Sequence, residues 1–319
     1  MDIDMHPCLR IEPRGGTANQ LLQFFFAANI QRLCENLEVT GCNVPEWGLV
    51  SKKTDYLPKR ELVLSGNYLF CDDIVKIISS KLCRNIALKG QAFRLSNYAR
   101  PEYYRPMIKS SIGEVAGYGE GHVVFHIRGG DILQPAHRDY YPIPFSYIDA
   151  VLKKADASPV FLGQMGESYY SEKLRERYPH AIFSPPKTAV EDFETLRHSH
   201  QIAVSISSFS WTAAWLSHAK TIHLPVAGFL HPLQRPDIDL LPVEDARYKF
   251  YQFEPFKWNA TQADIETLWQ ERDHMVWDTK ALLDLKEIAK EKIKIKSEFA
   301  RARLHARAYL RATADKFFL

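Results

Sequence analysis

Three short segments of this 319-residue sequence carry groups that suit the binding of an anion. In Arg14-Gly15-Gly16-Thr17-Ala18-Asn19-Gln20, two glycines let backbone N–H groups approach a ligand, and the helix expected next presents its positive end. In His126-Ile127-Arg128-Gly129-Gly130-Asp131, a guanidinium can grip a diphosphate with two parallel hydrogen bonds. In Ser205-Ile206-Ser207-Ser208-Phe209-Ser210-Trp211, hydroxyls and helix N–H groups can hold a phosphate.

Each segment also has a purely structural interpretation. The glycines can form an ordinary turn, Arg128 and Asp131 can brace a strand end, and the serines can cap a helix. Neither G-x-G-x-x-G nor G-x-x-x-x-G-K-[ST] is present, so no dinucleotide or P-loop motif decides the matter. The functional interpretation is favoured because all three segments follow predicted strands of α/β units, where such sheets bind ligands.

Short apolar strands alternate with longer helical stretches along the chain, which predicts an α/β fold. Strands are expected over 8–12, 122–127 and 202–206, each followed by a helix, the first of them over 19–37. Residues 113–121 contain four glycines and few side chains that could pack in a core, which suggests a domain boundary. We therefore expect a Rossmann-like domain over 1–116, a second over 117–260, a cleft between them, and a helical basic segment over 261–319.

The overall composition excludes several classes of protein. The chain has an ordinary globular composition, and its net charge of +3 is too balanced to suggest a nucleic-acid partner. Five cysteines without a C-x-x-C pair favour reduced thiols and give no zinc template. The sequence has no signal segment and no apolar run that approaches the ~18 residues needed to span a bilayer. These features predict a cytoplasmic protein, with any membrane contact at the inner face.

The basic charge is concentrated at the end of the chain. Residues 281–319 hold ten Lys and Arg against five Asp and Glu. Helical spacing predicts one apolar face made of Leu285, Ile288, Ile295, Phe299, Ala302, Ala306 and Leu310. Two interpretations remain open: a solvated helix that packs back on the body, or peripheral contact with an anionic membrane, where each basic residue contributes about 1 kcal/mol. If membrane contact by this segment carried the whole function, the chain would be a membrane-surface adaptor.

Together the three segments resemble motifs of the α-1,2-fucosyltransferase-like glycosyltransferases (family 11 and its relatives). The family's G-G-x-G-N-Q loop is matched by residues 15–20, and the following LLQFFFAAN is similar to its L-F-Q-Y-A-F helix. Its H-x-R-R-G-D motif is matched at His126, Arg128, Gly130 and Asp131, and its N-S-S-F-S-W-W-A-A-W-L by residues 206–216. Residues 90–98 are loosely similar to its G-Y-F-Q-S-E-K-Y-F stretch. The motifs occur in family order over about residues 8–230.

The sequence departs from the family at four motif positions: Ala18, Gly129, Ile206 and Thr212 stand where the family has Gly, Arg, Asn and Trp. The resemblance implies a GT-B fold and an inverting glycosyltransferase that moves L-fucose from GDP-β-L-fucose onto a glycan hydroxyl. The acceptor would be an oligosaccharide or lipid-linked glycan in surface polysaccharide or lipopolysaccharide synthesis. Because Gly129 replaces an arginine expected beside the donor, another nucleotide sugar stays open as the donor. Because no residue is fixed as the general base, a non-catalytic module that binds a nucleotide sugar or a carbohydrate also stays open.

The resemblance also implies roles for individual residues. Arg128 would bind the diphosphate and stabilise the departing nucleotide. The donor-binding set would be Gly15, Gly16, Asn19, His126, Arg128, Asp131, Ser207, Ser208 and Phe209. No metal or other cofactor is expected, because the Asp-x-Asp pairs at Asp2–Asp4 and Asp237–Asp239 lie at the terminus and in a proline-rich loop.

The general base is not fixed by the sequence. An in-line displacement needs a carboxylate or imidazole near the anomeric carbon of the donor. The loop after Asp131 supplies His137 and Asp139, and Glu12 lies just before the glycine loop. We take Arg128, His137 and Asp139 as the predicted catalytic residues, and Tyr140 and Tyr141 could stack on a sugar face.

Overall fold

The computed structural model describes residues 6–51, 61–135, 137–270, 274–276 and 278–317, so Asp2 and Asp4 lie outside the described residues. The chain forms two compact units. The first contains Met1–Ser111, Asp237–Leu240 and Lys290–Leu319, and the second contains Ile112–Pro236 and Leu241–Ala289.

The first unit is built on a four-stranded parallel sheet with strand order β2-β1-β6-β5. Leu9 and Ile11 of β1 are buried, as expected for a strand covered by helices. The first predicted helix ends at Leu33 rather than at residue 37, because Leu37 packs at the start of the next strand. The elements are β1 (Cys8–Ile11), α1 (Thr17–Leu33), β2 (Glu38–Thr40), the hairpin β3 (Asn43–Val44) and β4 (Leu49–Val50), β5 (Leu62–Leu64), α2 (Cys71–Ser79), β6 (Asn85–Leu88) and α3 (Pro101–Tyr104).

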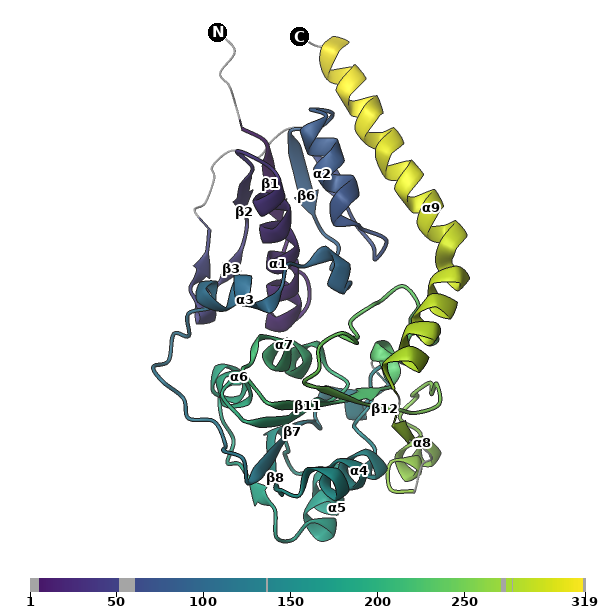
Figure 1. The fold of residues 1–319 in the computed structure, drawn as a ribbon. Coiled ribbons are helices and arrows are strands. Elements are labelled where there is room, and N and C mark those ends of the chain that lie inside the picture. The colour runs from purple at the N-terminus through teal and green to yellow at the C-terminus, as the bar shows by residue number, and fades with distance from the viewer. Residues whose placement is uncertain (1–5, 52–60, 136, 271–273, 277, 318–319) are drawn as a thin grey trace. The chain divides into compact units, whose positions relative to one another are not determined.

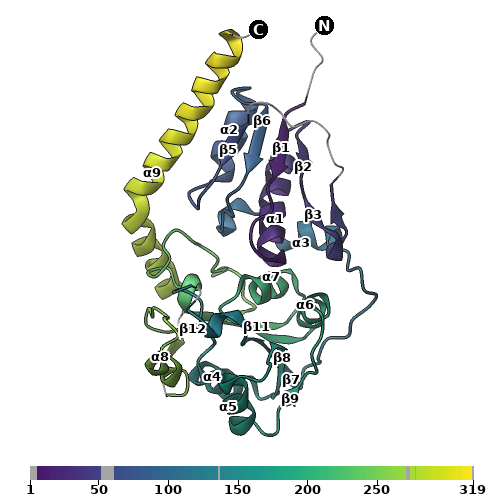
Figure 2. The same cartoon turned by 180° about the vertical axis from the view of Figure 1, so that it is seen from behind.

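The second unit is built on a seven-stranded sheet with order β13-β12-β11-β10-β7-β8-β9, parallel except for β13. Figure 1 shows α6 and α7 on one face of this sheet and α4 and α5 on the other, and the opposite view in Figure 2 agrees. The elements are β7 (His122–Arg128), α4 (Phe145–Ala155), β8 (Ser158–Gln164), α5 (Tyr169–Arg177), β9 (Ile182–Phe183), α6 (Ala189–Arg197), β10 (Gln201–Ala203), α7 (Ser208–Leu216), β11 (Thr221–Val226), β12 (Tyr248–Gln252), α8 (Gln262–Thr267) and β13 (Met275–Val276).

The strand order of the second unit creates a switch point. Numbered from β7, its parallel strands follow the doubly wound order 3-2-1-4-5-6. The chain leaves β7 and β10, which are neighbours, in opposite directions, and a crevice for ligands is expected at the carboxyl ends of two such strands. Both units are thus α/β structures on parallel sheets, which confirms the predicted fold class, while the cleft remains a prediction.

One glycine of the segment before β7 is in close contact with the second unit's own backbone. A Cβ on Gly117 would lie 2.1 Å from the carbonyl atoms of His198. The Tyr118 N–H donates to Ser199 Oγ at 3.1 Å, and the Tyr118 carbonyl accepts from the His200 N–H at 2.8 Å. Gly117 is therefore needed for close approach to the turn after α6, whereas Gly113, Gly119 and Gly121 have open space around the position of a Cβ.

The segment expected to be helical over 261–319 contains α8, the short strand β13 and one long helix, α9 (Thr279–Phe317), so it is not helical throughout. Its first residues, up to Ala289, belong to the second unit, and the rest belongs to the first. In the first unit, Arg301 and His305 donate to the buried carboxylate of Asp73 at 2.6 and 3.1 Å. Within the described residues, no helix is both long and apolar enough to cross a membrane.

Candidate functional site

Arg128 ends β7 at the switch point of the second unit. Its side chain is 26% exposed and donates two hydrogen bonds to Asp131, at 3.0 Å from Nε and 2.6 Å from Nη2. Asp131 is more exposed, and these bonds lower the pKa of its carboxyl. The guanidinium Nη1 has no hydrogen-bond partner among the described residues. Asp131 therefore orients Arg128 and leaves one edge of the guanidinium open for an anion.

Gly129 has a steric reason to be glycine. Its N–H donates to the carbonyl of Gln164 at 2.9 Å, which extends the β7–β8 ladder by one residue. A Cβ at this position would lie 2.6 Å from the same carbonyl oxygen. The second arginine of the family motif thus has no room here unless the backbone shifts.

His126 links the ends of β7 and β10. Its Nδ1 lies 2.9 Å from Ser205 Oγ, which lies 2.9 Å from Ser210 Oγ. Phe209 packs on the imidazole with 5.1 Å between ring centroids. Burial, followed by the charge of Arg128, lowers the pKa of His126 to about 3. The imidazole is therefore neutral at physiological pH, and it positions the serine turn rather than supplying charge.

The serine turn caps α7. Ser207 is the N-cap, and its Oγ accepts from the Phe209 N–H at 3.2 Å. Ser207, Ser208 and Phe209 thus stand at the positive end of a nine-residue helix. Within the second unit, the structure brings this turn to the same sheet edge as Arg128, with His126 between them.

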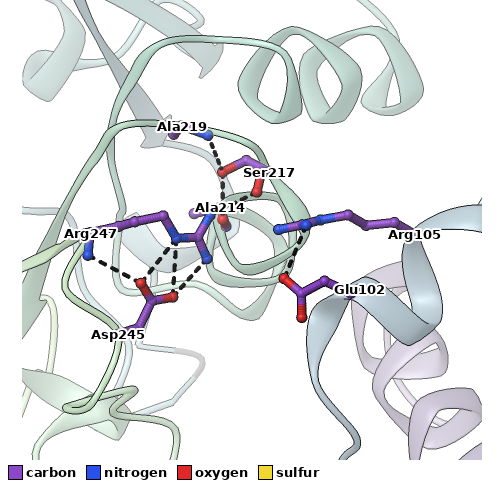
Figure 3. A network of polar contacts seen from close by, with 7 residues as sticks. All are labelled: Glu102, Arg105, Ala214, Ser217, Ala219, Asp245 and Arg247. Carbon is purple, nitrogen blue, oxygen red and sulfur yellow. Dashed lines mark hydrogen bonds and ion pairs between the residues drawn. The ribbon is translucent and has the colours of Figure 1, made fainter.

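The far end of α7 is held by a pair that sequence reasoning missed. Arg247 donates from Nη1 to the Ser217 carbonyl at 2.7 Å, and Asp245 holds the other edge of its guanidinium (Figure 3). A cation at the C-terminus of a helix complements its dipole. No motif marks this pair, because its partner carbonyl lies 30 residues away. Figure 3 also draws the Glu102–Arg105 pair of the first unit, at 3.1 Å.

The two predicted bases lie together but differ in environment. His137 is 52% exposed, and its Nδ1 accepts from the Asp139 N–H at 3.3 Å. Asp139 is 16% exposed, and it accepts from Gln234 at 2.9 Å and pairs with Arg235 at 3.3 Å. Asp139 therefore ties the loop after β7 to residues after β11, while the imidazole stays open to solvent.

The two predicted stacking tyrosines have different positions. Tyr140 presents its ring to Arg128 at 5.6 Å and stacks on Phe229 at 4.7 Å. Tyr141 is 1% exposed and stacks on Trp258, so it belongs to the core and not to a sugar-binding surface. Tyr140 supports the guanidinium through a cation–π contact.

The glycine loop of the first unit follows β1. Gly15 has φ +73°, and a Cβ there would lie 2.4 Å from Asn19 Nδ2, so only glycine fits. Gly16 is the N-cap of α1, and no side chain caps the first N–H groups of this helix. Gln23, which is fully buried, accepts from the Arg14 N–H and donates to the carbonyls of Glu12 and Gly90. Gln23 therefore holds the loop, a role that no sequence motif indicates.

The acidic pair Asp237–Asp239 also belongs to the first unit. Asn67 donates to the Asp237 carboxylate at 2.5 Å, and Arg94 donates to its carbonyl at 2.9 Å. The Asp239 N–H donates to the Phe93 carbonyl at 2.9 Å. These contacts give the pair a structural role, and no group of three metal-binding side chains occurs among the described residues. Glu12 pairs with Lys89 at 2.8 Å.

A cavity of about 660 Å³ lies elsewhere in the second unit, along the side of α4. Its lining includes Ser146, Asp149, Lys153, Arg177, Trp269 and His274, and none of the predicted site residues. It therefore gives the predicted site no support.

Comparison with known proteins gives few matches. No protein-family model matches the sequence, and no curated protein matches it. Similar solved structures include two of TibC. One is the dodecameric iron-containing heptosyltransferase TibC in complex with ADP-D-β-D-heptose, with TM-score 0.36, 16% identity, and coverage of 71% of this chain and 59% of that chain. The other is TibC from enterotoxigenic E. coli H10407, with TM-score 0.35, 15% identity, and coverage of 75% and 63%. The aligned region thus spans about three fifths of the TibC chains.

Proposed function

We propose that this protein is an inverting glycosyltransferase that moves a sugar from a nucleotide sugar to a glycan hydroxyl. The observation that carries the proposal is the junction of β7 and β10. There Arg128, with one guanidinium edge open, and the serine turn at the start of α7 share the carboxyl edge of a doubly wound sheet. A fixed arginine and helix N–H groups are both groups that bind phosphates well.

The proposed chemistry is a single displacement. The acceptor oxygen attacks the anomeric carbon, the bond from that carbon to the diphosphate oxygen breaks, and the acceptor proton passes to a base. Arg128 and the start of α7 stabilise the negative charge on the departing nucleotide. His137 is the better-placed base in this proposal, because Asp139 is already engaged by Gln234 and Arg235.

The donor proposed first is GDP-β-L-fucose, which rests on the resemblance of the three motifs. A different nucleotide sugar is the second candidate, and a specific observation favours it. The backbone at Gly129 leaves no room for the arginine that the fucosyltransferase-like motif carries. The acceptor proposed is an oligosaccharide or lipid-linked glycan, and a metal-independent reaction is proposed with it.

Thermal-shift and calorimetric titration with GDP-, UDP-, ADP-, dTDP- and CMP-sugars test the proposal. We expect one nucleotide series to raise the Tm, and Arg128→Ala to weaken its binding by roughly 10- to 150-fold, the value of a charge-assisted hydrogen bond. Arg177→Ala is the matched control, because Arg177 also pairs with a carboxylate, Asp149, away from the switch point. Absence of any nucleotide effect would contradict the proposal. Binding without release of nucleotide in the presence of glycan acceptors would leave a non-catalytic module.

A further inference from the structure

Helix α9 has two apolar faces where the sequence predicts one. The face packed against the protein consists of Leu282, Leu285, Ala289, Ile293, Leu304 and Ala308. The other face is open to solvent: Ile288 is 53% exposed, Ile295 82%, Phe299 70%, Tyr309 61% and Leu310 66%. Leu285 therefore does not share a face with the exposed residues, and that part of the prediction was wrong. Large apolar side chains this exposed on one helix indicate a binding surface.

The exposed face follows a heptad repeat. Ile288, Ile295, Ala302 and Tyr309 are seven residues apart, and Lys292, Phe299 and Ala306 lie four residues after the first three of them. This alternation of four and three is the spacing of the d and a positions in a coiled coil. At 1.5 Å per residue, the stripe from Ile288 to Tyr309 is about 30 Å long. The stripe, which we call the α9 seam, is therefore suited to a second helix.

The charges beside the α9 seam define the direction of that second helix. Glu291 and Glu298 occupy the g positions on one flank, and Lys296 and Arg303 occupy the e positions on the other. In a parallel pair, each g residue meets the e residue five positions later on the other helix. Glu291 would meet Lys296, and Glu298 would meet Arg303. An antiparallel pair would instead place glutamate beside glutamate and base beside base.

We propose that the α9 seam pairs in parallel with the α9 seam of a second copy of this chain. The flanking charges also favour a second copy over an anionic lipid surface, because the two carboxylates and the two bases that border the seam cancel each other. Lys292, Ala302 and Ala306 weaken the apolar core, so the association is reversible and depends on concentration. The proposal does not depend on the transferase activity, and its failure would leave the proposed function untouched.

Sedimentation velocity of the full-length protein over a wide concentration range is the first test. We expect a monomer–dimer equilibrium in the wild type, and a monomer at every concentration for Ile295→Glu. Val50→Glu is the matched control, because Val50 is 60% exposed on β4 and should not alter association. Circular dichroism melting verifies that each variant is folded. A wild type that is monomeric throughout overturns the proposal, as does a dimer that survives Ile295→Glu.

A charge exchange tests whether the charges that flank the α9 seam hold the pair together. The variant with Glu291→Lys and Glu298→Arg has only bases on both flanks, and the variant with Lys296→Glu and Arg303→Glu has only acids. Each should be monomeric alone, and an equimolar mixture should form the heterodimer. Persistence of either variant as a homodimer would refute the pairing.

Sedimentation with vesicles of phosphatidylcholine, with and without phosphatidylglycerol, tests whether an anionic membrane binds the α9 seam instead. A monomeric wild type that binds the anionic vesicles, and loses that binding in Ile295→Glu, would overturn the proposal.

Discussion

Acidification should destabilise this protein through one buried imidazole, that of His126. Burial, together with the charge of Arg128, lowers the pKa of His126 from 6.5 to about 3 in the folded state. Between these two values the unfolded chain binds a proton that the folded chain does not, so the free energy of unfolding falls as the pH decreases. From pH 7 to pH 4.5 this difference is roughly 2.5 kcal/mol, or a Tm lower by roughly 5–10 °C.

The assay is urea unfolding of the wild type and of His126→Asn from pH 4.5 to pH 8. The difference between the two proteins isolates His126, because other groups titrate alike in both. His223, whose pKa burial also lowers to about 3, and Asp192, whose pKa burial raises to about 6, are two such groups. Below pH 6 the free energy of unfolding of the wild type should fall more steeply than that of the variant, by about 1.4 kcal/mol per pH unit.

Above pH 7 the two curves should run parallel, which supplies the internal control for the constant cost of the substitution. Equal pH slopes below pH 6 would refute the reasoning, because they would mean that the folded protein protonates His126 as readily as the unfolded chain does.

Three further predictions concern local contacts. Gly129→Ala should lower the free energy of unfolding by roughly 1–3 kcal/mol, because its Cβ meets the Gln164 carbonyl, and an unchanged urea midpoint would contradict this. Asp139→Ala should lower the Tm, measured by calorimetry, because it releases the side chains of Gln234 and Arg235. His137→Ala should leave the Tm unchanged and reduce kcat. If Asp139→Ala instead reduced only kcat and His137→Ala lowered only the Tm, the roles of the two residues would be reversed. Asp73→Ala removes a buried carboxylate that holds two α9 side chains, and should speed amide hydrogen exchange in residues 290–313; unaltered protection would count against that contact.

Local patterns were enough to predict the elements around the candidate site. The alternation of apolar strands and helices placed Arg128 at the end of a strand and Ser207 at a helix start, as the structure has them. The two glycines predict a turn at Gly15, and the φ of Gly15 is +73°, a conformation that favours glycine. These features depend on residues within a few positions of each other, so their signal is contained in a short window of sequence.

Contacts between distant residues could not be predicted in this way. His126 and Ser205 are 79 positions apart, and only the strand order of the sheet makes them neighbours. Gln23 reaches across 67 positions to Gly90, and its place in the apolar run LLQFFFAAN does not indicate this partner.

The sequence by itself determined the periodicity of each element, and therefore the α/β class and the positions of the candidate anion-binding segments. Tertiary structure decided which strands lie side by side, which loop residues are tied down, and which face of α9 is buried. Helical periodicity shows that apolar residues recur along one face of a helix, but whether that face is buried depends on which other elements pack against it. Leu285 and Ile295 therefore look equivalent in the sequence, although one is buried and the other is 82% exposed.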